Sequence, residues 1–222
     1  MTNLLHIDSS ARPGRAGEQA HGSQSRRLSH AFVSRWRAAR PGDEVVYRDL
    51  AVSEPIPVRH EWIHAVYTPE AQRTPAHHAV LGESDGLVRE LKAAEVLVIG
   101  MPMYNFGMPA PLKAWVDNIV RIAATFDFDP GRDNPYVPLL ADRPRRAVLL
   151  TSRGGNGFDA GGALAAMNHA DTALRDVLGF IGITDVQTVA IENEEAGGEA
   201  LAASVAQALS AIDALADAWL KA

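Results

Sequence analysis

Short apolar runs alternate with longer amphipathic stretches along most of this 222-residue chain. Two of the runs, Val96–Ile99 and Ala147–Leu150, are apolar at every position, which is typical of parallel strands that helices cover on both faces. Strands are predicted over Leu4–Asp8, Glu44–Arg48, Val96–Met101, Ala147–Thr151 and Val186–Ile191. The alternation therefore predicts an α/β fold, a doubly wound five-stranded parallel sheet with helices on both faces.

The connections between these strands contain apolar residues at helical spacing. Helices are predicted from near Ser25, around Leu87 to Ala94, from Pro111 onward, over Ala170–Leu178 with a stop at Gly179, and from about Glu199 to Leu220. Segment Ala51–Gly82 contains four prolines and is predicted to be the one irregular connection. Connections of that length usually have a functional or partner-binding role.

Composition restricts the class of protein. The length fits one domain over residues 1–222, and the hydrophobic share of 47% is ordinary for a soluble protein. A net charge of −6 offers no basic face for nucleic acid, and zero cysteines exclude disulfides and thiolate chemistry. No stretch approaches the roughly 20 apolar residues of a membrane span, and no signal peptide is evident. We therefore expect a cytoplasmic location, with no membrane or nucleic-acid partner.

Polar segments follow the first predicted strand, at the sheet edge where α/β proteins bind ligands. Ser9 follows that strand, and Ser23, Gln24 and Ser25 begin the first predicted helix. Free N–H groups and the helix dipole make a helix start an anion site, so these residues are candidates for binding a phosphate. A serine at this position also serves as an ordinary helix N-cap, and the sequence leaves both interpretations open.

Two further segments follow the third and fourth strands. They are Pro102, Met103, Tyr104, Asn105 and Phe106, and then Ser152, Arg153, Gly154 and Gly155. The first combines aromatic and amide side chains that suit a flat heteroaromatic ring, although such a loop also packs on its own domain in many proteins. The glycines of the second permit close approach of the backbone to a ligand. We interpret the second segment as contacting the edge of the same ring.

The segment from His60 to His64 reads H-E-x-x-H, which on a helix is a zinc-binding pattern. It lies in a proline-bounded connection, and the remaining histidines provide a third ligand only at uncharacteristic spacing. Surface histidines are the favoured interpretation, so no metal is predicted. A zinc hydrolase remains a rival hypothesis.

Taken in order, these segments resemble the FMN-dependent NADH-azoreductase family, also described as NADH:quinone oxidoreductases. Thr125-Phe126 and the run from Gly179 to Ile183 belong to the same resemblance, which extends from Leu4 to the last helix. It implies a flavodoxin-like domain that binds FMN. The implied cofactor-binding residues are Ser9, Ser23, Gln24 and Ser25 at the phosphate, Pro102 to Phe106 along the isoalloxazine, and Ser152, Arg153, Gly154 and Gly155 at its other edge.

The resemblance also implies a reaction and an assembly. NADH or NADPH would pass hydride through FMN to quinones and azo compounds in two half-reactions, with no catalytic side chain. The family is homodimeric with its active site at the interface, where Phe128 and Phe180 would shape the acceptor pocket. The chain departs from the family at Ala11–Gly22 and Asp127–Pro138. A flavodoxin-like electron carrier that binds FMN without nicotinamide turnover is the alternative.

Overall fold

A computed structural model describes residues 1–221, and its centre is a five-stranded parallel sheet in the order β2-β1-β3-β6-β7. The strands are β1 (Asn3–Asp8), β2 (Glu44–Asp49), β3 (Val96–Pro102), β6 (Arg146–Ser152) and β7 (Asp185–Ile191). The predicted α/β, doubly wound, flavodoxin-like architecture is confirmed. The strand order reverses between β1 and β3, so a crevice is expected outside the carboxyl ends of these two strands.

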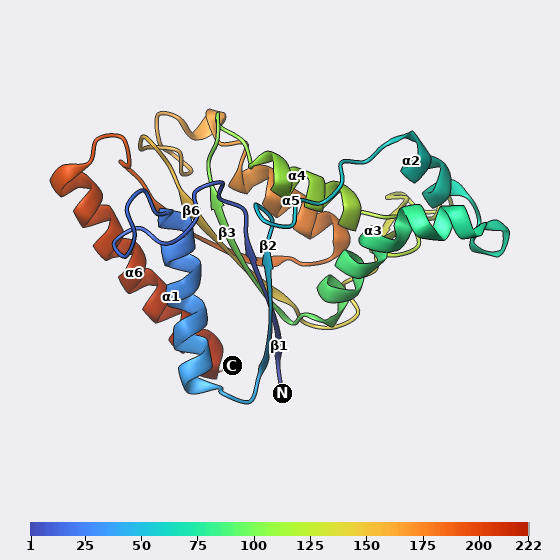
Figure 1. The fold of residues 1–222 in the computed structure, drawn as a ribbon, viewed down its shortest axis with the longest axis horizontal. Helices are drawn as coiled ribbons and strands as arrows, with labels where there is room; N and C mark the ends of the chain where they lie inside the picture. Colours follow the sequence, from blue (N-terminus) through green and yellow to red (C-terminus); the bar gives the residue numbers. More distant parts are fainter. Residues whose placement is uncertain (222) are drawn as a thin grey trace.

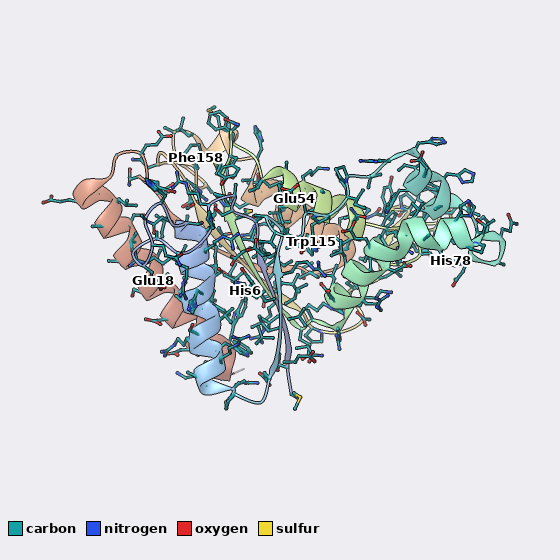
Figure 2. All side chains as sticks on the ribbon, in the orientation of Figure 1. His6, Glu18, Glu54, His78, Trp115 and Phe158 are labelled. Carbon is teal, nitrogen blue, oxygen red and sulfur yellow. The ribbon has the colours of Figure 1, made fainter. Side chains whose placement is uncertain are left out.

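Helices cover both faces of the sheet (Figure 1). They are α1 (Gln24–Ala39), α2 (His60–Tyr67), α3 (Pro75–Ala93), α4 (Ala110–Ile119), α5 (Asp171–Ile181) and α6 (Gly198–Lys221). Helices α1 and α6 bury one hydrophobic cluster against the sheet, and α3, α4 and α5 bury another on the opposite face. Trp115 of α4, labelled in Figure 2, is fully buried in the second cluster. The two layers hold the carboxyl ends of the strands in place.

Helix α5 differs from its prediction at the C-terminal end. It continues past Gly179 to Ile181, and Gly182 ends it with a left-handed φ of 108°. A Cβ atom on residue 182 would lie 2.5 Å from the backbone nitrogen of Ala141. The predicted stop at Gly179 is therefore wrong, because the close approach of another segment makes the second glycine the cap.

Segment 51–82 is also more regular than predicted. It contains α2 and the beginning of α3, in which Pro75 occupies the first turn behind the N-cap Thr74. Proline is favourable there because its missing N–H would have no partner in the helix. Helix α2 packs on α3 through a small hydrophobic cluster that includes Trp62, Ala65 and Leu81. The two helices extend away from the sheet in Figure 1.

Two other features were not predicted. A short antiparallel hairpin of β4 (Phe126–Phe128) and β5 (Tyr136–Pro138) follows α4, with strands too short to leave a pattern. Helix α6 is long and apolar enough to qualify as a membrane span by length and composition alone, which corrects the expectation that no stretch approaches that limit. Here one face of α6 packs beside α1 and on the sheet, through residues such as Ile212 and Trp219.

Candidate functional site

Side chains from four loops meet in a cleft of about 420 Å³ at the carboxyl edge of the sheet. The cleft is lined by Ser10, Arg12, Ser23, Gln24, Pro102, Met103, Tyr104, Ser152, Gly154, Glu194 and Glu195. The loops after β1, β3 and β6 were each predicted from the sequence to bind a ligand, and the sheet brings them together. Phe158, labelled in Figure 2, marks this edge of the molecule.

The N-terminus of α1 forms one corner of the cleft. Ser23 is the N-cap, and its hydroxyl accepts a hydrogen bond from the Arg26 amide at 3.3 Å. Within residues 1–221, the N–H groups of Gln24 and Ser25 donate no hydrogen bond, and the buried Oε1 of Gln24 accepts none. The corner therefore offers two N–H donors at the positive end of a helix, which suits an anion, and one acceptor that suits a hydroxyl.

Two of the predicted phosphate ligands lie behind this corner. The Ser25 hydroxyl is fully buried and lies 2.9 Å from the Ser23 hydroxyl. The Ser9 hydroxyl donates to the carbonyl of Gly100 at 3.1 Å, and its amide bonds the same carbonyl. Neither residue is among those that line the cleft. The Ser25 hydroxyl contacts Ser23, and the bonds of Ser9 join the end of β1 to β3.

The wall after β3 is a tight turn. Tyr104 and Gly107 exchange two backbone hydrogen bonds of 3.0 Å, and Asn105 and Phe106 between them have φ values of 49° and 69°. Positive φ at both central positions is a type I′ geometry, which is strained for a residue as bulky as Phe106 and is often retained at functional sites. The turn directs Tyr104 into the cleft, whereas Asn105 and Phe106 are not among the lining residues.

The loop after β6 contributes Ser152 and Gly154 to the cleft but not the side chain of Arg153. That guanidinium is fully buried and bonds Asp159 and Asp171 at 2.8 Å and Glu192 at 3.0 Å. Burial opposes its charge, yet the three carboxylates outweigh this effect and raise the pKa of Arg153. Arg153 therefore fastens the loop to its surroundings. Gly155, also predicted, lies outside the lining.

Four lining residues were not predicted, namely Ser10, Arg12, Glu194 and Glu195. Ser10 directly precedes the 11–22 insertion, and Arg12 lies near its beginning. The backbones of Gly14 and Ala16 are hydrogen-bonded to the backbone of Ser23, so the insertion folds back onto the start of α1. The glutamates follow β7. The sequence signal that could have identified them is their position after the carboxyl end of a predicted strand.

A buried arginine that was also missed supports the loop after β1. Arg26 donates to the carbonyls of Ser10 at 2.8 Å and Arg12 at 3.0 Å, and to both oxygens of Asp49 at 2.7 Å. Burial is the largest single effect on the pKa of each group and opposes its charge. Hydrogen bonds and opposite charges together outweigh it, so the pKa of Arg26 is raised and the pKa of Asp49 is lowered. The ion pair thus ties one wall of the cleft to β2.

Phe128 and Phe180, predicted to shape an acceptor pocket, lie together but outside this cleft. Phe180 contacts Phe126 and Tyr136 with ring centroids 5.1 and 5.3 Å apart, and Phe128 contacts Tyr136 at 5.6 Å. The cluster lies beyond the end of α4, which runs back from the carboxyl edge of the sheet. Within one chain these rings do not line the cleft, although Phe128 is 47% exposed.

His60 and His64 lie on the exposed side of α2, whose opposite side buries Trp62. The two predicted surface histidines are therefore on a helix. Across residues 1–221, no group of three or more His, Cys, Asp or Glu side chains is arranged to hold a metal ion.

Comparison with known proteins places the chain among flavoenzymes. A family model described as a flavodoxin-like fold matches residues 2–216. The chain is 46% identical to an FMN-dependent NAD(P)H:quinone oxidoreductase 1 of Pseudomonas aeruginosa, over 97% of this chain and 99% of that one. It is 41% identical to an FMN-dependent NADH:quinone oxidoreductase 2 of Idiomarina loihiensis, over 97% and 90% of the two chains. A solved azoreductase from Bacillus anthracis superposes with a TM-score of 0.84 at 27% identity, covering 97% and 99%.

Proposed function

The chain belongs to the flavodoxin-like family of FMN-dependent NADH:quinone oxidoreductases, and from this membership we infer that its cleft binds FMN and that the enzyme carries electrons from NADH or NADPH to quinones and azo compounds. The observation that carries the inference is the convergence of three predicted loops in one cleft of about 420 Å³. A cleft of this volume is within the range of small-molecule and cofactor sites.

The residues present fit FMN. The unbonded N–H groups of Gln24 and Ser25 suit its phosphate, and the buried, donorless Oε1 of Gln24 suits a ribityl hydroxyl. At Gly154 a Cβ atom would lie 2.6 Å from Oε1 of Glu195, so the Glu195 side chain packs directly on this glycine in the wall of the cleft. An uncharged or unhydroxylated ligand would leave these polar groups unsatisfied.

When bound, FMN supplies the two-electron chemistry of the reaction. The role of the protein is then to bind the flavin and to orient it. The start of α1 holds the phosphate end, the strained turn after β3 presents Tyr104, and Ser152 and Gly154 line the opposite wall. Within residues 1–221, the N–H groups of Asn105 and Phe106 in this turn donate no hydrogen bond, although neither residue lines the cleft. We assign no side chain the role of obligate acid or base.

The test is an anaerobic visible spectrum of the FMN-loaded protein, before and after addition of NADH and then of a quinone. We expect bleaching of the flavin band by NADH and its return with the quinone. A flavin band that neither NADH nor NADPH bleaches would support an electron carrier instead. Failure to retain any flavin would overturn the proposal.

A double substitution tests the phosphate corner. Ser23→Ala with Ser25→Ala removes the N-cap hydroxyl and the hydroxyl that supports it, so we expect FMN to bind about 10- to 100-fold more weakly. Fluorescence titration measures the change. Ser34→Ala, an exposed serine of the same helix, is the control and should leave FMN affinity unchanged. Equal FMN affinity of the double variant and the wild type would contradict the assignment.

We further propose a homodimer in which the partner's aromatic cluster completes the acceptor pocket. Phe128 and Phe180 lie outside the cleft of their own chain, so a second subunit would be needed to bring these two rings to the acceptor. We likewise propose that residues 1–222 form one domain and that the protein is located in the cytoplasm.

The dimer has two readouts. Light scattering should give twice the chain mass of 23.8 kDa. Phe128→Ser, at a 47% exposed position, should raise the KM for the quinone several-fold while NADH still bleaches the flavin. A monomer with wild-type KM would refute the interface site.

A further inference from the structure

An ion pair spans the mouth of the cofactor cleft. Arg12 in the 11–22 insertion and Glu194 after β7 are 182 positions apart in sequence, and Nη1 of Arg12 lies 2.6 Å from Oε1 of Glu194. Both residues line the cleft. The Arg12 side chain is 56% exposed, so few contacts besides this pair hold its guanidinium, which is free to turn to another anion.

Backbone hydrogen bonds join the two glutamates to the loop after β6. The amide of Glu194 donates to the carbonyl of Arg153 at 3.2 Å, and that of Glu195 to the carbonyl of Gly154 at 2.9 Å. The Glu195 carboxylate lies so close over Gly154 that a Cβ atom there would be 2.6 Å from its Oε1. The backbone that carries the two glutamates is thereby bonded to the loop after β6, and the Glu195 side chain lies against Gly154.

The net charge of the residues that line the cleft has the same sign as the phosphate of FMN. Its charged lining residues are Arg12, Glu194 and Glu195, a sum of −1, whereas a phosphate monoester carries roughly −1.5 to −2 near neutral pH. Charges of like sign repel strongly at the separations found inside one cleft. With Arg12 paired to Glu194, the helix start and its N–H groups must hold the phosphate without the one guanidinium among the described residues that line the cleft.

We propose that Glu194 competes with the phosphate of bound flavin for Arg12, and that Glu194 and Glu195 thereby set how strongly the cleft prefers a phosphorylated flavin to an uncharged one. The inference rests on the proposed function, because it requires flavin in this cleft. A built-in competitor weakens cofactor retention and lets FMN exchange.

The test is a pair of fluorescence titrations, of FMN and of riboflavin, on the full-length chain freed of flavin. The variants are Glu194→Gln and Glu195→Gln, with Glu199→Gln as the matched control outside the cleft. For Glu194→Gln we expect FMN to bind about tenfold more tightly and riboflavin to change less than twofold, because only FMN carries the phosphate. Glu195→Gln should act in the same direction and more weakly, and Glu199→Gln should change neither.

Arg12→Gln completes a double-mutant cycle. In the Arg12→Gln background, Glu194→Gln should tighten FMN binding less than threefold, because the contested guanidinium is absent. The proposal is overturned if Glu194→Gln leaves the FMN-to-riboflavin ratio unchanged or weakens FMN binding. If the wild-type protein binds FMN and NADH bleaches the bound flavin, but Glu194→Gln has the same FMN-to-riboflavin affinity ratio as the wild type, only this inference fails. If wild-type protein binds neither flavin, the proposed function fails.

Discussion

Arg153→Met should lower the free energy of unfolding by about 3–5 kcal/mol, which is the cost of leaving buried charges without their partner. The guanidinium is fully buried and is shared by Asp159, Asp171 and Glu192. The Asp171 side chain is only 8% exposed, so its charge would have little access to water after the substitution. Urea denaturation followed by circular dichroism measures the loss.

The matched control removes one partner from the exposed side of this network. Asp159 is 70% exposed, so Asp159→Asn should cost under about 1 kcal/mol. If Arg153→Met were as stable as this control, the network would determine the position of the loop rather than stability. FMN titration would then test the positional role, since a displaced Gly154 would weaken FMN binding even though the stability is unchanged.

Arg26→Met should destabilise the protein by a similar amount, about 3–5 kcal/mol, and should also weaken FMN binding. The substitution leaves Asp49 without its bidentate partner and the carbonyls of Ser10 and Arg12 without a donor. The same two residues line the cleft, so their loop is expected to lose its position. Denaturation and FMN titration on one preparation measure both effects.

Arg35→Met on the same helix is the control, because Arg35 is 41% exposed and pairs with Asp217 at the surface. We expect it to cost under about 1 kcal/mol without changing FMN affinity. The double variant Arg26→Met, Asp49→Leu should recover part of the lost stability, since it removes the unpaired Asp49 carboxylate. The recovery is expected to be partial because the buried Asp8, whose Oδ2 lies 3.6 Å from Nη1 of Arg26, still loses its cation. No recovery in that variant, with FMN affinity intact, would show that Arg26 does not act through Asp49 and the loop.

The ion pair also predicts a pH dependence. The pKa of Asp49 is lowered in the folded protein, so its contribution to stability is present above the ordinary carboxyl value and is lost as the pH falls through the lowered one. Arg26→Met removes the cause of the lowering. Its stability should therefore fall less steeply than that of the wild type below about pH 4.

Much of the fold follows from patterns that are local in the sequence. Runs such as Val96–Ile99 require cover on both faces, and that requirement with the helical spacing between them determines a doubly wound sheet. The site follows in turn, because the carboxyl ends of parallel strands share one edge. For this reason Ser23, Tyr104 and Ser152 could be assigned to one cleft while still far apart in sequence.

Only the tertiary structure decided what depends on contacts between distant segments. The sequence pattern predicted a helix stop at Gly179, whereas the close backbone at Leu140–Ala141 makes Gly182 the cap. Adjacent residues of an extended chain point to opposite sides, so Ser152 faces the cleft while its neighbour Arg153 is directed into a buried ion network.

The sequence by itself determined the sheet, its ligand-binding edge and the flavin chemistry that the family motifs imply. Only the structure showed that Arg26 and Arg153 hold the loops that form the walls of the cleft. Only the structure showed that Arg12 and Glu194 form an ion pair among its lining residues. The physical reason is that a charged side chain acts through whichever partner the fold brings within hydrogen-bonding distance, and for Arg12 that partner is 182 positions away.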